Sequence, residues 1–198
     1  MKSLFTLILA FGAIFLFQAS PLAADDPAPV DVDSPFGKNL VIVYSVTGNT
    51  LKMAEIIQGI THGDLYQIET VEEYPVGDKL IPFAKKMRDD NVLPTIKGTP
   101  PDVSGYDAIF LGTPVWFHDL PAPTQVFLEN IDFQGKTVIP FVTAGGGPGD
   151  IMATLGEKIR NAKLLEAKIV TRFGIRPIDE LEREIDAWLK TLAPAPAP

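Results

Sequence analysis

The chain of 198 residues contains no cysteine and only two histidines. The absence of cysteine excludes disulfide bonds, thiolate metal sites and thiol redox chemistry. His62 and His118 are too few and too far apart in the sequence for a convincing zinc site, so no metal site is predicted. If the protein takes part in redox chemistry, a bound cofactor therefore has to carry the electrons.

Basic residues are also scarce. Lys and Arg number 17 against 25 Asp and Glu, which gives a net charge of −8. Residues 1–24 contain one Lys and no acid, so their removal would leave 16 basic and 25 acidic residues and a net charge of −9. This balance argues against binding to nucleic acid or to anionic membrane surfaces, and it favours basic partners.

The longest apolar run lies at the N-terminus, where Lys2 precedes the uncharged residues 4–17. The run of about 14 residues is shorter than the roughly 20 that a membrane span needs. Residues 1–24 are therefore predicted to be a cleaved signal peptide, which implies export, most simply to a bacterial periplasm, with no stable membrane insertion afterwards. An uncleaved N-terminal membrane anchor is the alternative. A lipid anchor is excluded because no Cys follows the run.

The rest of the chain divides into a linker, one domain and a tail. Residues 25–37 are rich in Pro and Asp and lack apolar periodicity, which predicts a linker. Residues 38–192 suit a single domain with its own core. Residues 193–198 have the sequence APAPAP and are predicted to be an unstructured tail.

The most informative stretch begins with the apolar run 40–44, which predicts a strand buried on both faces of a parallel sheet. A loop with hydroxyl groups and one glycine follows, and helical spacing begins at Leu51. A strand, such a loop and a helix start form an anion site, because the first-turn N–H groups and the helix dipole point into the loop. The alternative is a Ser/Thr helix cap without a ligand. The loop contains neither Lys nor Arg and is therefore not a Walker A loop; it comprises Ser45, Val46, Thr47, Gly48, Asn49 and Thr50.

Two further loops follow predicted strands. The strand 106–112 leads into a loop with two adjacent aromatic residues, which form either a ligand wall or a cap on the core. The strand 136–143, which contains Pro140 at some cost to its hydrogen bonding, leads into a run of glycines. Glycines let the backbone approach a flat ligand closely, although a flexible loop without a ligand is the alternative. The residues expected to contact a ligand here are Pro114, Val115, Trp116 and Phe117 in one loop and Thr143, Ala144, Gly145, Gly146 and Gly147 in the other.

The elements alternate as strand and helix five times, which predicts a parallel sheet with helices on both faces. The other two strands are expected at 65–70 and 164–170, and the longer helices at 50–60, 78–90 and 177–192. Right-handed crossovers leave few arrangements, and the common five-strand order is 2-1-3-4-5. In that order the three loops meet at one carboxyl edge. A phosphate on the first loop and a ring between the aromatic and glycine loops together indicate FMN.

The sequence resembles the flavodoxin-like family, which includes the flavodoxins and FMN quinone reductases. Residues 45–50 match the Ser/Thr-x-Thr-Gly-Asn-Thr phosphate loop, residues 113–129 resemble the family's aromatic segment, and residues 135–141 match its fourth strand. Two positions depart from the pattern: Phe117 stands where Trp is usual, and Ala144 stands where many members have His. The resemblance implies a three-layer α/β/α sandwich, FMN phosphate bound by the 45–50 loop, a ring stacked on Trp116 or Phe117, and hydrogen bonds from the backbone at 144–147.

Three function classes follow from these predictions. The leading one is an exported FMN protein that transfers electrons to a redox partner protein, in an acidic pocket that lowers the flavin potential. The second is an FMN-dependent oxidoreductase that reduces a small acceptor such as a quinone. It has no identified catalytic residue: His118 is placed to donate a proton, but a solvated loop histidine is the simpler interpretation. The third is a binding module that kept the fold and lost the cofactor.

Overall fold

The computed structural model describes residues 34–192. The predicted signal peptide 1–24, most of the predicted linker and the predicted tail 193–198 lie outside the described residues. The end of the predicted linker lies inside them and belongs to the domain: Phe36 is 9% exposed and packs edge-on against Phe110, with 5.1 Å between ring centroids. No helix among residues 34–192 is long and apolar enough to cross a membrane.

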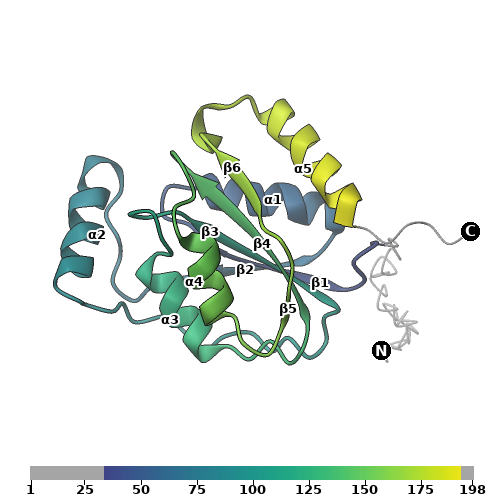
Figure 1. The fold of residues 1–198 in the computed structure, drawn as a ribbon, viewed down its shortest axis with the longest axis horizontal. Coiled ribbons are helices and arrows are strands. Elements are labelled where there is room, and N and C mark those ends of the chain that lie inside the picture. The colour runs from purple at the N-terminus through teal and green to yellow at the C-terminus, as the bar shows by residue number, and fades with distance from the viewer. Residues whose placement is uncertain (1–33, 193–198) are drawn as a thin grey trace, which may run out of the picture. The chain divides into compact units, whose positions relative to one another are not determined.

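The centre of the domain is a parallel sheet whose strands follow the order β2-β1-β3-β4-β5, with β6 also paired to β4 (Figure 1). This confirms the predicted order and the predicted α/β fold. The central strands β1, β3 and β4 are buried almost throughout, which agrees with their continuous apolar sequence. The strands are β1 Asn39–Tyr44, β2 Asp64–Ile68, β3 Ala108–Pro114, β4 Thr137–Ala144, β5 Lys163–Leu164 and β6 Lys168–Thr171.

Helices cover both faces of the sheet and create two cores (Figure 1). Alternation along β1 sends Val41 and Val43 into the core beneath α1 and α5, and Leu40 and Ile42 into the core beneath α3 and α4. The predicted three layers are therefore present. The helices are α1 Asn49–Thr61, α2 Leu80–Asp89, α3 Ala122–Asn130, α4 Ile151–Lys158 and α5 Ile178–Leu192, with short 3₁₀ turns η1 Gly77–Lys79 and η2 Phe173–Ile175.

The fifth strand differs from the single strand predicted over 164–170. It consists of β5 and β6, separated by residues 165–167, and Pro140 of β4 explains the break. The carbonyls of Lys136 and Val138 in β4 accept hydrogen bonds from the N–H groups of Lys163 and Leu165. The backbone groups of every second residue of a strand point to the same neighbouring strand, so the backbone of Pro140 also faces the fifth strand. Proline has no N–H to donate there. The interruption therefore falls where β4 cannot complete the ladder.

The helix predicted over 78–90 is divided into η1 and α2, and α2 lies apart from the other helices (Figure 1). Its buried side chains, Leu80 and Ala84, form a small cluster with Tyr74 and do not belong to either core of the sheet. Ile81, which helical periodicity places on the same side as Leu80 and Ala84, is 56% exposed. The periodicity predicted a helix correctly, but it could not show how little surface this helix would cover.

Candidate cofactor-binding site

The three predicted loops meet at the carboxyl edge of the sheet and are hydrogen-bonded to one another. The phosphate loop (residues 45–50) is joined to β4 by the hydroxyls of Thr50 and Thr143, whose oxygens are 2.7 Å apart. The aromatic loop (residues 113–118) is joined to the same strand by the Val115 N–H, which donates to the Thr143 carbonyl at 2.9 Å. It is joined to the glycine loop (residues 143–149) by the Asp150 N–H, which donates to the His118 carbonyl at 2.8 Å. The topology therefore assembles one site from three separate segments.

The phosphate loop presents free N–H groups at the start of α1. Gly48, the residue before the helix, has φ of 85°, a left-handed conformation that glycine adopts without strain. No side chain among the described residues caps this end, so the helix-cap alternative does not explain the hydroxyl groups. The first-turn N–H groups have no intrahelical partner. With Thr47 and Gly48 exposed, these donors are positioned to bind an anion.

The side chains of the phosphate loop have different roles. Thr50 is 1% exposed and its hydroxyl pairs with Thr143, so this pair fixes the loop to the sheet. Ser45 and Val46 are half-buried, and Asn49 lies against the backbone of η2 at Gly174. Of the six residues predicted to bind phosphate, those at the tip are the most accessible.

The glycine loop has an open surface beside the phosphate loop. A Cβ atom built on Gly145, Gly146 or Gly147 would meet no atom within 4 Å, and none of the three has a positive φ. Neither backbone strain nor packing within the described residues therefore requires glycine at these positions. Glycine does leave the backbone open to close approach by a ligand, as the sequence predicts. Ala144, which precedes them, is 5% exposed. Its methyl side chain offers no polar group to the site.

The aromatic loop ends in a tight turn. Trp116 and Asp119 exchange backbone hydrogen bonds of 2.9 Å, and the two residues between them, Phe117 and His118, have φ of 53° and 65°. Two consecutive left-handed residues are typical of a type I′ turn, for which Asn-Gly is the usual sequence. A left-handed phenylalanine is strained, and such strain concentrates at functional positions.

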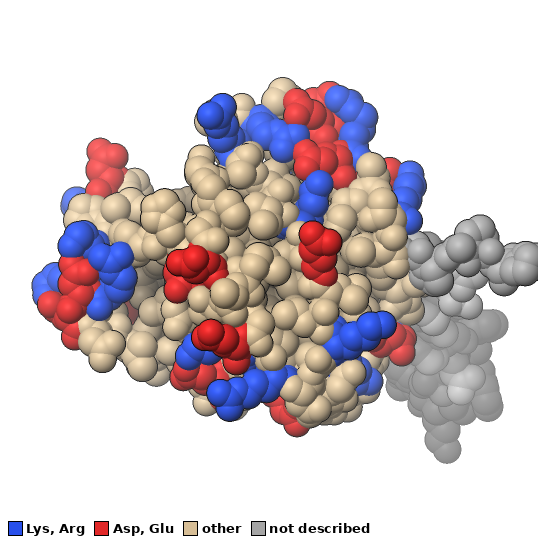
Figure 2. Space-filling model, in the orientation of Figure 1, with Lys and Arg blue, Asp and Glu red and all other residues tan. Residues whose placement is uncertain are grey.

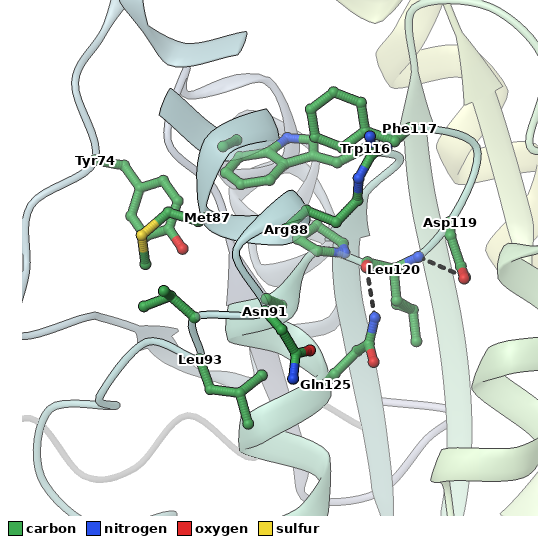
Figure 3. Close-up of a pocket in the computed structure, with 14 residues that line it drawn as sticks. Tyr74, Met87, Arg88, Asn91, Leu93, Trp116, Phe117, Asp119, Leu120 and Gln125 are labelled. Atoms are coloured by element: carbon green, nitrogen blue, oxygen red, sulfur yellow. Dashed lines mark hydrogen bonds between the residues drawn. The ribbon is translucent and has the colours of Figure 1, made fainter. Parts of the chain in front are cut away.

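The two aromatic side chains point toward α2 (Figure 3). The Trp116 ring packs against Tyr44 and Tyr74, at centroid distances of 5.8 and 5.4 Å. The Arg88 guanidinium lies 4.3 Å from the centroid of the Phe117 ring. The half-buried Trp116 and Phe117 therefore cap an aromatic cluster, as one of the two alternatives predicted, and stacking on a flavin stays a prediction.

A cleft of about 310 Å³ separates the aromatic loop from α2 and from residues 91–93 (Figure 3). Its walls are the rings of Tyr74, Trp116 and Phe117. Its polar lining includes the charged side chains of Arg88 and Asp119, and the exposed Asn91, which makes no side-chain hydrogen bond within residues 34–192. The Gln125 amide nitrogen donates to the Leu120 carbonyl at 2.9 Å. The cleft suits a small planar molecule.

A second cleft, of about 420 Å³, opens beyond the ends of β1 and β2 and reaches Ser45 and Val46. Tyr44 contributes to its wall, and the Tyr44 hydroxyl is buried without a hydrogen-bond partner within residues 34–192. Burial, with a smaller contribution from the neighbouring Tyr74, raises the pKa of Tyr44 far above its ordinary value. Tyr44 therefore stays neutral near neutral pH.

Charged side chains gather over α2 and α5, and further charged groups lie near the middle and along the lower part of the face in Figure 2. Most of these charges form exposed ion pairs within their own helix, such as Lys86 with Asp90 on α2 and Arg183 with Asp179 on α5. Such pairs add little stability. At the start of α1, next to the phosphate loop, Lys52 is paired with Glu55 at 3.2 Å.

A fourth segment at this edge was not predicted. The turn after β6, residues 171–176, touches both the glycine loop and the phosphate loop through Arg172 and Gly174. The sequence gives no local signal for this, because the fifth strand is weak and broken and no known motif follows it. Its position follows only from the assembled sheet.

Comparison with known proteins agrees with this architecture. The flavodoxin family model matches residues 38–190. A Bacteroides eggerthii protein described as a candidate flavoprotein is 28% identical, with a TM-score of 0.63, over 80% of this chain and 99% of its own. Its counterpart from Bacteroides uniformis is 25% identical, with the same TM-score, over 76% and 99%. A Lactobacillus acidophilus flavoprotein in complex with FMN shares the fold at 24% identity, with a TM-score of 0.59, over 77% and 98%.

No curated protein matches the chain. The family model nevertheless extends across the whole described sheet, from the residue before β1 into the last turns of α5. The structure adds the strand order and the three converging loops, which that match alone does not contain. The chain belongs to the flavodoxin family.

Proposed function

We propose that the protein binds FMN at the carboxyl edge of the sheet and acts in electron transfer. One observation carries the proposal: the uncapped first turn of α1 lies beside three glycines that neither backbone conformation nor packing explains. The first-turn N–H groups and the tip of the phosphate loop hold the phosphate. The backbone at 144–147 lies along the ring. When bound, FMN supplies one- or two-electron chemistry.

The similar proteins support this cofactor. The Lactobacillus acidophilus flavoprotein has been described both in complex with FMN and in an apo form, so its fold does not depend on the cofactor. In the present chain the three loops are likewise fixed by their own hydrogen bonds. We therefore expect the apo protein to be folded and ready to bind FMN.

The test is a titration of the purified protein with FMN, followed by flavin absorbance and fluorescence. Gly146→Val places a side chain on the open glycine surface and is expected to weaken FMN binding at least tenfold. Gly105→Val is the matched control, because Gly105 also has open space around it and a φ outside the positive range, but lies at the opposite edge, before β3. Equal affinity of both variants, or no binding by the unaltered protein, would refute the proposal.

A second function is favoured by the 310 Å³ cleft beside the aromatic loop. Room for a small molecule beside Trp116 and Phe117, the residues predicted to stack on the flavin, suits an FMN-dependent oxidoreductase acting on an acceptor such as a quinone. A pure electron carrier needs only an exposed flavin edge and a redox partner protein. Steady-state reduction of a soluble quinone by NAD(P)H, lost in Leu93→Trp but kept in Ile81→Trp, would select the enzyme. Leu93 lines the cleft, whereas the exposed Ile81 of α2 does not.

The proposal also includes export of the protein, which is supported by the sequence alone. The predicted signal peptide is expected to be removed near Ala24, which delivers the domain to the periplasm. Fractionation of bacteria that produce the full chain, with mass determination of the purified protein, tests this. A full-length mass in the membrane fraction would instead indicate the N-terminal anchor.

A further inference from the structure

The turn after β6 contacts two of the three loops that form the site. The Arg172 N–H donates to the carbonyl of Ala144 at 2.7 Å, and Ala144 directly precedes the open glycines. Two residues later, Gly174 lies so close to Asn49 that an added Cβ would be 2.9 Å from the Asn49 Oδ1 atom. The turn that begins at Arg172 therefore lies between the start of the glycine loop and Asn49, at the end of the phosphate loop.

The backbone of this turn is fixed from both sides. Arg172 has φ of 52°, an uncommon conformation for a residue with a side chain, and its carbonyl accepts from the Ile175 N–H at 3.2 Å. The next residue, Phe173, is 6% exposed and packs in the core beneath α1 and α5. Because the buried phenylalanine fixes the turn, the Arg172 side chain lies on the surface at the carboxyl edge.

The charge of Arg172 is not neutralised by the described part of the chain. Arg88, Arg176 and Arg183 each form ion pairs with carboxylates, but Arg172 forms none within residues 34–192. The phosphate loop itself contains no cation, and Lys52 is paired with Glu55. A phosphate bound there would meet only N–H and hydroxyl donors in a net acidic protein. A guanidinium is well suited to complete such a site, because its fork of donors matches phosphate oxygens.

We propose that Arg172 binds the FMN phosphate and gives the protein its preference for FMN over riboflavin, which lacks the phosphate. This inference depends on the proposed FMN site, because it assigns one further residue to that site. The chain thus supplies the positive charge of its phosphate site from the opposite end of the domain, after the last strand rather than after the first.

The experiment measures dissociation constants for FMN and riboflavin by flavin fluorescence, in the unaltered full chain and in Arg172→Gln. We expect the variant to bind FMN about tenfold more weakly, the factor that 1.4 kcal/mol represents, and to bind riboflavin unchanged. Added salt is expected to weaken FMN binding more in the unaltered protein than in the variant, because exposed charge pairs are screened.

Two further variants separate charge from structure. Arg160→Gln is the matched control: Arg160 is exposed and forms no ion pair within residues 34–192, but it follows α4 at the opposite edge of the sheet. It should leave both dissociation constants unchanged. Arg172→Lys keeps the positive charge but loses the forked donors of the guanidinium. It should retain part of the FMN affinity that Arg172→Gln loses.

The outcomes distinguish this inference from the proposed function. If the unaltered protein binds neither flavin, the FMN site itself is wrong. If it binds FMN and Arg172→Gln leaves that affinity unchanged, only the role of Arg172 is refuted. Equal losses for FMN and riboflavin would also refute it, because they would show that Arg172 supports the ring or the fold rather than the phosphate.

Discussion

The glycine loop and the aromatic loop lie next to each other at the carboxyl edge, but they are built in opposite ways. The glycine loop has three residues with relaxed backbone and empty space above them. The aromatic loop has two residues with left-handed backbone, and its rings are packed against other side chains. One loop is relaxed and open, whereas the other is strained and filled.

The difference separates a loop that leaves room from a loop that is filled. The three open glycines at the carboxyl edge would let a ligand approach the backbone closely. The aromatic loop has strained backbone, as functional positions do, but its rings are already packed against Tyr44, Tyr74 and Arg88. The aromatic residues therefore stabilise the edge, and the glycines leave room on it. Four predictions test this division, from the largest expected effect to the smallest.

The largest effect is expected at the contact between the two loops. Gly149 differs from the open glycines, because its φ is 61° and an added Cβ would lie 2.0 Å from the His118 carbonyl oxygen. Gly149→Ala should lower the free energy of unfolding by about 3 kcal/mol, from steric overlap and left-handed strain. Chemical denaturation measures it. Gly146→Ala, with open space around it, should stay within about 0.5 kcal/mol of the unaltered protein. Similar losses in both variants would remove the distinction between the two kinds of glycine.

The next effect concerns the packing of the aromatic loop. Trp116→Ala removes contacts with Tyr44 and Tyr74 and should lower the free energy of unfolding of the apo protein by about 2 kcal/mol, less than for a fully buried Trp. Thermal or chemical denaturation without flavin measures this, and Trp116→Phe should recover part of the loss. An apo protein of unchanged stability would mean that Trp116 serves the ligand rather than the scaffold.

A smaller effect is expected for the hydroxyl pair that joins the phosphate loop to β4. Thr50→Val and Thr143→Val should each lower the free energy of unfolding by about 1 kcal/mol, because each leaves a buried partner unsatisfied. The double variant should lose less than the sum, since both partners are then gone. A double-mutant cycle measures this coupling, and strictly additive losses would show that the hydrogen bond contributes nothing.

The smallest effect has the opposite sign. The buried Tyr44 hydroxyl has no partner within residues 34–192, so Tyr44→Phe should raise the free energy of unfolding by up to about 1 kcal/mol. Because burial raises the folded-state pKa of Tyr44, the unfolded chain loses this proton first. The associated stability is complete below the unfolded pKa of about 10 and declines as the pH rises above it.

Denaturation between pH 8 and pH 11 tests this alkaline decline, which Tyr44→Phe should reduce. Tyr106→Phe provides a comparison: Tyr106 donates to Asp64 at 2.8 Å, and this hydrogen bond is the main reason that its pKa is raised. Loss of the Tyr106 hydroxyl should therefore destabilise the protein. A destabilised Tyr44→Phe would show that the hydroxyl has a partner after all.

The sheet and the convergence of the three loops were predictable because they depend on local signals. The apolar runs of β1, β3 and β4 fix the central strands, and the hydroxyl and glycine loops directly follow two of them. The chain order of strands and helices then leaves few arrangements. For these parts, local sequence and tertiary structure agree.

The features that were not predictable depend on distant segments. The direction of Trp116 depends on Tyr74, far along the chain and outside any regular element. The break in the fifth strand depends on Pro140 of its neighbour, and the position of Arg172 depends on that strand. Ile81 shows the same limit, since helical periodicity does not reveal whether a core lies beneath the helix. Each of these features depends on tertiary packing that no local pattern encodes.

The interruption opposite Pro140 has a consequence for how this architecture can change over time. Residues 165–167 separate two short segments that pair with β4 independently, so their lengths and registers are not tied to each other. Extra residues inserted there would form an excursion at the sheet margin and would leave both pairings intact. The point at which β4 cannot form a hydrogen bond is therefore also the point at which a lineage can add a new segment without rebuilding the domain.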